Sequence, residues 1–156
     1  MVLINFFYEK KGSLPFDKDC VRLWLKGVVK KENKTLGCVN FIYCTDDYLL
    51  DLNKTYLKHT SLTDVITFNF SENKKTIEGD VYISTERVKE NAKAFSETFS
   101  LELLRTMVHG VLHLIGYNDK ITEDKKLMVE KENHFLSDFK LNKKFHVEQK
   151  KDVREI

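Results

Sequence analysis

The sequence predicts a single α/β (α+β) domain with a mixed sheet of about four strands and about five helices around it. Segments rich in branched and aromatic residues alternate along the chain with segments whose apolar residues recur at helical spacing. A length of 156 residues suits one domain with a sizeable core. The 42% hydrophobic and 32% charged content is that of a globular protein.

The first half of the chain has the order strand, helix, strand, helix. We expect a strand at 2–8, a helix at 16–31 and a second strand at 36–44. A second helix is expected up to Leu57, because Thr45 offers a capping oxygen and two acids follow it.

The second half adds two strands and three helices. The strands are expected at 65–70 and 80–84, paired antiparallel because only a short polar turn separates them. The helices are expected at 84–95, at 101–115 and from Thr122 to about Phe139. The domain would therefore span 1–139, and a basic C-terminal tail would span 140–156.

Composition excludes several classes of protein. The apolar N-terminal run is cut short at residues 9–11 and lacks a positive leader, so no signal peptide is expected. No stretch approaches the roughly 20 apolar residues of a membrane span. The odd number of cysteines without C-x-x-C spacing predicts reduced thiols in a cytoplasmic protein; they are Cys20, Cys38 and Cys44.

Net charge alone does not predict a nucleic-acid partner. The formal charge of +2 is almost neutral. The tail at 140–156 has a basic excess that is a candidate phosphate contact, although a solvated terminus is the simpler interpretation.

One predicted helix contains the residues that point most directly to a function. The segment 101–115 is apolar around most of its circumference, which predicts a helix buried on nearly every side. Its polar residues Glu102, Arg105, His109 and His113 follow at spacings of three, four and four, so they form one stripe on one face. Because polar side chains are costly on a buried helix, we expect this stripe to have a function.

The stripe predicts a metal site. His109 and His113 lie one turn apart, which lets two imidazoles hold one ion. Gly116 then ends the helix, so the chain can turn and bring Asp119 back over the last turn. Two imidazoles and a carboxylate leave a fourth position for water, as in a catalytic zinc site that lowers the pKa of that water. Gly110 disfavours a helical zinc protease, whose glutamate base follows the first histidine.

The nine residues from His109 to Tyr117 resemble the H-G-x-L-H-L-x-G-Y signature of the YbeY family. The resemblance extends to Leu52-Asn53 with Tyr56, to the segment 63–68 and to the segment 79–84. It implies a single-strand-specific, metal-dependent endoribonuclease that acts in small-subunit (16S) rRNA 3′-end maturation and ribosome quality control. RNA and the small ribosomal subunit are the implied partners, and the oligomeric state is left open.

Two residues depart from the family pattern. Asp119 stands where the family usually has a third histidine, so the ligands would be two imidazoles and a carboxylate. One Zn²⁺ per chain is expected, with manganese, nickel or iron as alternatives. Leu57 stands where the family commonly carries an arginine, a presumed phosphate contact, and Lys58, His59 or Arg105 are candidates to replace its charge.

The predicted catalytic residues are Arg105, His109 and His113. Arg105 is expected either to position phosphate through its planar fork or to form a salt bridge with an acid such as Glu102. Asp64 and Asp80 are candidates to orient a ligand histidine from behind, or else they begin strands and loops.

Two other functions remain open at this point. The chain is alternatively a non-catalytic ribosome-assembly factor whose metal only joins helix to loop, or a metallohydrolase on another substrate such as peptides or small esters. Replacing His109 and His113 by alanine would distinguish an assembly factor from an enzyme. If the fold survives, an assembly factor keeps its function and an enzyme loses it.

Overall fold

The computed structural model describes residues 3–9 and 12–155, with side chains described as far as residue 139. One four-stranded sheet has the order β1-β2-β4-β3. Its strands β1 (Ile4–Tyr8), β2 (Thr35–Cys44) and β4 (Thr76–Ser84) run parallel, while β3 (Val65–Asn69) is antiparallel to β4. The predicted mixed sheet and its antiparallel pair are confirmed.

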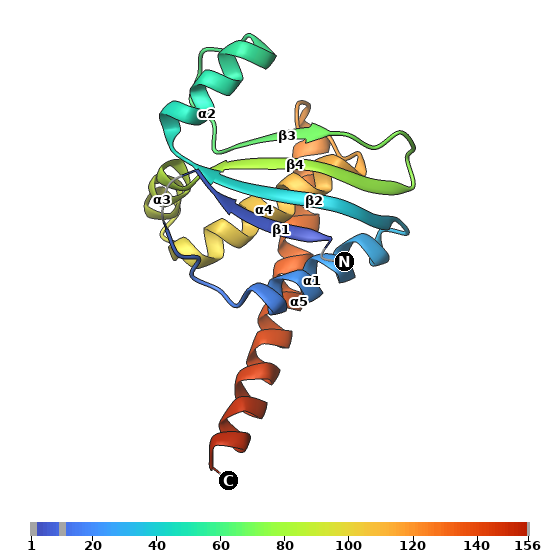
Figure 1. The fold of residues 1–156 in the computed structure, drawn as a ribbon, viewed down its shortest axis with the longest axis vertical. Coiled ribbons are helices and arrows are strands. Elements are labelled where there is room, and N and C mark those ends of the chain that lie inside the picture. The colour runs from blue at the N-terminus through green and yellow to red at the C-terminus, as the bar shows by residue number, and fades with distance from the viewer. Residues whose placement is uncertain (1–2, 10–11, 156) are drawn as a thin grey trace.

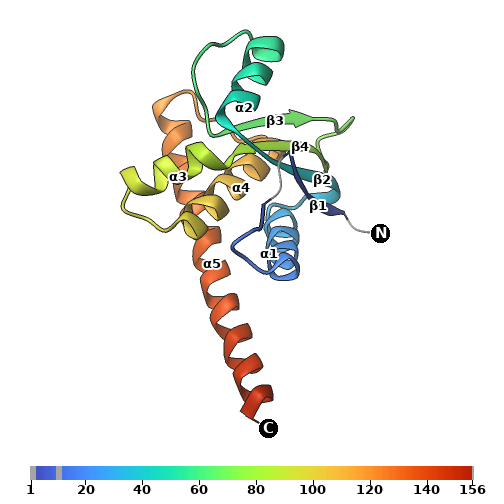
Figure 2. The same ribbon diagram turned by 60° about the vertical axis from the view of Figure 1, so that its left-hand side comes forward.

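Helices cover the sheet unequally (Figures 1 and 2). On the inner face lie α1 (Lys18–Lys31) and α4 (Phe99–Ile115), and α5 (Thr122–Glu155) packs against both of them. The outer face carries α2 (Asp46–Leu52) and the π-helical turn η1 (Asn53–Leu57), and α3 (Thr85–Ala94) follows β4. No helix within the described residues is long and apolar enough to cross a membrane.

Alternation along the strands builds the core. On the central strand β2, Val39, Phe41 and Tyr43 point inward and are at most 2% exposed. They meet apolar residues of α1, α4 and α5, among them Met107 and Phe135. The core therefore lies between the sheet and α4, and it fixes the helix that carries the candidate ligands.

Three helices differ from the prediction at one end. The first helix begins at Lys18 rather than 16, because the Asp17 carboxylate accepts from the Cys20 N–H and caps it. The fourth begins at Phe99 rather than 101, since Thr98 caps it. The last helix runs to Glu155, beyond the predicted end at Phe139, because residues 140–155 contain neither glycine nor proline. The division between a domain at 1–139 and a tail stays a prediction.

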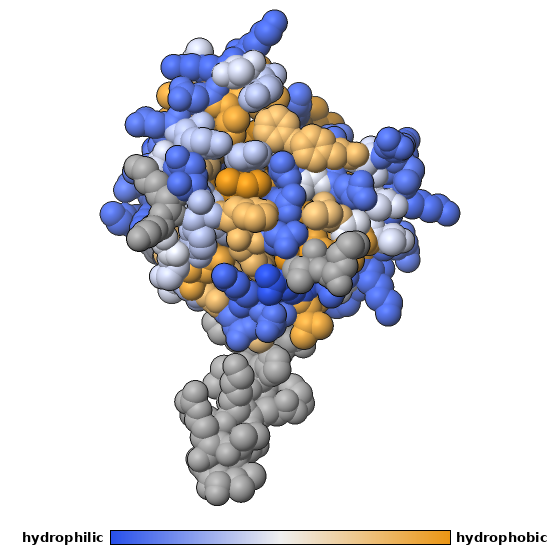
Figure 3. Space-filling model, in the orientation of Figure 1, coloured by the Kyte–Doolittle hydropathy of each residue, from blue (hydrophilic) through white to orange (hydrophobic). Residues whose placement is uncertain are grey.

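The outer sheet face is only partly covered. Side-chain hydrogen bonds run across three strands there, from Asn5 to Asn40 at 3.1 Å and from Asn40 to Asp80 at 3.0 Å. Figure 3 shows apolar side chains gathered among polar ones on the face that it displays. The metal-ligand candidates lie on the other side of the sheet, on α4 and in the loop after it.

Candidate metal centre

Two glycines determine how α4 packs and where it ends. A Cβ added at Gly110 would lie 2.6 Å from a Val81 methyl group, so the helix approaches β4 more closely than a side chain would permit. Gly116 ends the helix with a φ of 126°, a conformation that glycine adopts without strain. Close packing against Val81 therefore explains why residue 110 is a glycine.

The predicted ligands converge. His109 and His113 bring their Nε2 atoms to 3.0 Å from each other. The Asp119 Oδ2 atom lies 3.2 Å from the His113 Nε2 atom and 3.3 Å from the His109 Nε2 atom. The turn at Gly116 therefore returns Asp119 to the helix, as the sequence predicts, and the three residues form a possible metal site.

Hydrogen bonds fix both imidazole rings from behind. His109 donates from Nδ1 to the Glu132 carboxylate at 2.7 Å, and His113 donates from Nδ1 to the Tyr117 carbonyl oxygen at 2.9 Å. Because carboxylates and carbonyls only accept, both rings carry their proton on Nδ1. Each neutral ring then turns an unprotonated Nε2 atom toward Asp119.

This arrangement fits a divalent cation. Three lone-pair atoms face one point, and no hydrogen-bond donor lies among them when both rings are neutral, so a cation or a proton is needed there to relieve their repulsion. Ligand atoms of a tetrahedral zinc site lie about 3.3 Å apart when each is about 2.0–2.1 Å from the ion. The separations of 3.0–3.3 Å therefore suit one ion with a further position open to the cavity.

The environment of His109 favours its charged form. Burial alone disfavours the imidazolium, but the hydrogen bond and negative charge of Glu132, helped by Asp119 and Asp64, outweigh burial and raise the pKa of His109. A raised pKa means that protons compete with a metal for this nitrogen at higher pH than at an ordinary histidine.

Arg105 points toward α5. Its guanidinium donates to the Asn133 side-chain oxygen at 2.9 Å and to Glu132 at 3.4 Å, and it lies 3.9 Å from Glu102. The salt-bridge alternative is therefore present in the structure, and Arg105 is not among the residues that line the cavity beside the ligands. Its role as a phosphate contact stays a prediction.

Neither Asp64 nor Asp80 orients a ligand histidine, and that expectation is wrong. Glu132 and the Tyr117 carbonyl occupy the two Nδ1 atoms. Asp80 accepts from Asn40 on the outer sheet face. Asp64 lines the cavity, accepts weakly from Asn91 at 3.4 Å, and has a pKa raised by burial.

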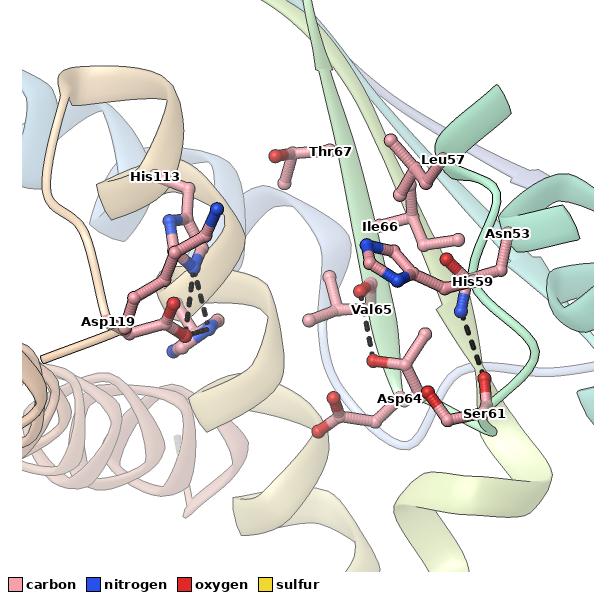
Figure 4. A pocket seen from close by; sticks show the side chains of 13 residues that line it. Asn53, Leu57, His59, Ser61, Asp64, Val65, Ile66, Thr67, His113 and Asp119 are labelled. Atoms are coloured by element: carbon pink, nitrogen blue, oxygen red, sulfur yellow. Dashed lines mark hydrogen bonds and ion pairs between the residues drawn. The ribbon is translucent and has the colours of Figure 1, made fainter. Parts of the chain in front are cut away.

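A cavity of about 510 Å³ opens beside the ligands. Figure 4 shows His113 and Asp119 on one side and Leu57 and His59 on the other. The opposite wall comes from η1, the loop after it and β3, and its residues are Asn53, Leu57, His59, Ser61, Thr63, Asp64, Val65, Ile66 and Thr67. Lys120 also lines the cavity, whereas Lys58 does not.

Sequence reasoning missed Glu132. Its carboxylate is 7% exposed, and it joins His109 to Arg105. The available signal was an acid at a core position of α5, where Met128, Phe135 and Leu136 recur at helical spacing and are buried. The Tyr117 carbonyl had no signal, because a backbone acceptor is set by the turn and not by residue type.

The fold and this centre together define a metal-dependent hydrolase. The ligands follow from one buried helix and the loop after it, and they face an open cavity rather than a closed cage.

Comparison with known proteins gives the family. The family model described as "Endoribonuclease YbeY" matches residues 8–140. A protein named "Endoribonuclease YbeY" from Flavobacterium psychrophilum is 45% identical to this chain, over 94% of this chain and 99% of its own length. A protein of the same name from Cytophaga hutchinsonii is 47% identical, over 86% of this chain and 94% of its own length. The solution structure of a Thermotoga maritima protein is 30% identical, with a TM-score of 0.64, over 92% of this chain and 93% of that one.

The chain belongs to the YbeY endoribonuclease family, as its signature residues indicate. Membership agrees with the hydrolase centre and makes RNA the substrate class.

Proposed function

We propose that this chain is a single-strand-specific endoribonuclease that matures the 3′ end of small-subunit (16S) rRNA and takes part in ribosome quality control in the cytoplasm. The observation that carries the proposal is the convergence of two Nε2 atoms and one carboxylate oxygen, 3.0–3.3 Å apart, at the side of an open cavity. Family membership supports RNA as the substrate.

The shape of the cavity supports single-stranded RNA. The side chains of His109 and His113 are only 21% and 23% exposed and lie at the side of the cavity, so a phosphodiester would approach their Nε2 atoms through it. A flexible strand can bend into such a cavity and splay out its bases, whereas an A-form duplex is rigid and presents its phosphates along a broad surface.

The chain's own residues prepare the reaction. His109, His113 and Asp119 would hold one Zn²⁺, which when bound lowers the pKa of a water molecule and stabilises charge on a phosphoryl oxygen. In the neutral rings, Glu132 and the Tyr117 carbonyl hold the proton on Nδ1 and direct both Nε2 lone pairs at the ion.

Lys120 and His59 are the best-placed groups to replace the arginine that the family commonly carries at the position of Leu57. Both line the cavity, and Lys120 follows the ligand Asp119 directly. An ammonium at this position can attract a phosphate without orienting it as an arginine would. We therefore assign phosphate binding to Lys120 first, with His59 on the opposite wall.

RNA cleavage assays test the proposed function. Purified chain with Zn²⁺ is expected to cut a single-stranded oligoribonucleotide and to leave the same sequence in a duplex uncut. His109→Ala and His113→Ala should abolish cleavage while keeping the fold. His134→Ala is the matched control, because that side chain lies on α5 and is 63% exposed. Equal cleavage by all three variants would overturn the proposal.

Cells without the protein test the ribosomal part. Small-subunit rRNA with an unprocessed 3′ end is expected, and the wild-type gene should correct it. Correction by the His113→Ala variant would instead favour an assembly factor whose metal is structural.

A further inference from the structure

We propose that Tyr117, Glu32 and Lys131 form a clamp, here called the Tyr117 clamp, that positions the metal-ligand loop and orients His113. The clamp rests on the proposed metal-binding role of that loop. Its members come from three parts of the chain: the turn after α4, the end of α1, and α5.

The backbone of Tyr117 is one part of the argument. Its N–H donates to the Leu112 carbonyl at 3.0 Å, and its carbonyl accepts from the His113 Nδ1 atom at 2.9 Å. The same residue therefore closes α4 and fixes the ring of His113. Asp119 lies only two residues further on, so the position of Tyr117 also sets where the carboxylate ligand can reach.

The side chain of Tyr117 is held at its far end. The phenol O–H donates to the Glu32 carboxylate, whose other oxygen lies 3.2 Å from the Lys131 ammonium. That ammonium also lies 5.6 Å from the centre of the Tyr117 ring. Each member thus contacts both others.

Glu32 is well placed to hold the Tyr117 turn in position. It is the residue directly after α1, and its side chain is only 10% exposed. A carboxylate largely removed from water holds its two donors more strongly than an exposed one would. Because α1 and α5 both pack in the core, the clamp ties the ligand loop to rigid helices.

His109 is oriented differently. Glu132, which accepts from its Nδ1 atom, sits within α5 and is held by helix packing. The acceptor for His113 belongs to a turn, so without the phenol its position depends on backbone alone. The clamp gives this turn the support that α5 already gives to Glu132.

Partners that orient a ligand histidine typically change metal affinity by 10–100-fold when they are lost. For the clamp, which acts one step further away, we expect the Zn²⁺ dissociation constant to rise about 10-fold in Tyr117→Phe and in Glu32→Ala. Glu32→Gln keeps an oxygen that accepts from the phenol, so it should recover most of the wild-type affinity.

The experiment measures two properties of the full-length variants. Zn²⁺ affinity is measured by competition with a chromogenic chelator, and the protonation of the His113 ring is measured by ¹⁵N NMR in chelator-treated protein. The wild-type ring should be in the Nδ1–H form, and Tyr117→Phe should mix it with the Nε2–H form. Lys31→Ala is the matched control, because the 2.6 Å Lys31–Asp138 pair joins α1 to α5 without touching the loop.

The clamp is overturned if Tyr117→Phe and Glu32→Ala keep the wild-type affinity and ring form, or if Lys31→Ala loses as much affinity as they do. Should Glu32→Ala unfold, the comparison of Tyr117→Phe with wild type decides, and should Tyr117→Phe unfold, the comparison of Glu32→Ala with Glu32→Gln decides. A wild-type chain that binds no Zn²⁺ would refute the proposed metal site, while the NMR arm would still test the clamp.

Discussion

Glu132→Gln tests whether the centre is built as described. The substitution keeps the size of the side chain but removes the charge that faces both His109 and Arg105. A hydrogen bond to a charged group contributes about 1.5–3 kcal/mol and a neutral one about 0.5–1.5 kcal/mol, so the fold should lose about 1 kcal/mol. The variant should therefore remain folded and measurable.

The effect on metal binding should be larger and should depend on pH. The amide oxygen still accepts from His109, but loss of the charge behind the ring predicts an about 10-fold weaker Zn²⁺ site near pH 8, about 1.4 kcal/mol. In the wild type, the raised pKa of His109 makes affinity fall as pH drops through a value above 6.5. Without the Glu132 charge that pKa falls, so the acid limb of the affinity curve should move to lower pH.

The assay is a Zn²⁺ titration with a competing chelator between pH 5.5 and 8.5, in wild type and variant. Two superimposed curves would refute the reasoning, because they would mean that the charge of Glu132 neither strengthens the metal site nor raises the pKa of His109.

Three further predictions follow from the same geometry. Gly110→Ala should lower the free energy of unfolding by about 1–3 kcal/mol in urea melts, because its Cβ would lie 2.6 Å from Val81; unchanged stability would mean that α4 shifts freely. Zn²⁺ at 100 times its dissociation constant should stabilise the fold by about 2.7 kcal/mol, raising Tm by about 5–10 °C in a thermal scan, and a chelator should reverse this. Lys120→Ala should raise KM for single-stranded RNA about 10-fold with little change in kcat, whereas an unchanged KM would remove Lys120 from phosphate binding.

Much of the centre could be predicted because it follows from local sequence. The spacing of His109 and His113 fixes their common helix face, and Gly116 permits the turn that returns Asp119. The strands could be recognised by their alternation, and the short turn before β4 predicted its antiparallel partner.

The remainder depends on which helices meet in space. Glu132 and Glu32 act on the centre from α5 and α1, and no local pattern joins them to α4. Arg105 shows the same limit: its stripe position was correct, but the acids of α4 and α5 determine where its guanidinium points. Asp64 and Asp80 were chosen by type, while tertiary packing placed the orienting acceptors elsewhere.

Anomalous diffraction at the zinc edge, from crystals of the full chain grown with Zn²⁺, tests the central claim most directly. The account predicts one peak per chain, about 2.0–2.2 Å from the Nε2 atoms of His109 and His113 and from a carboxylate oxygen of Asp119. A peak elsewhere, or none in protein whose fold is intact, would contradict it.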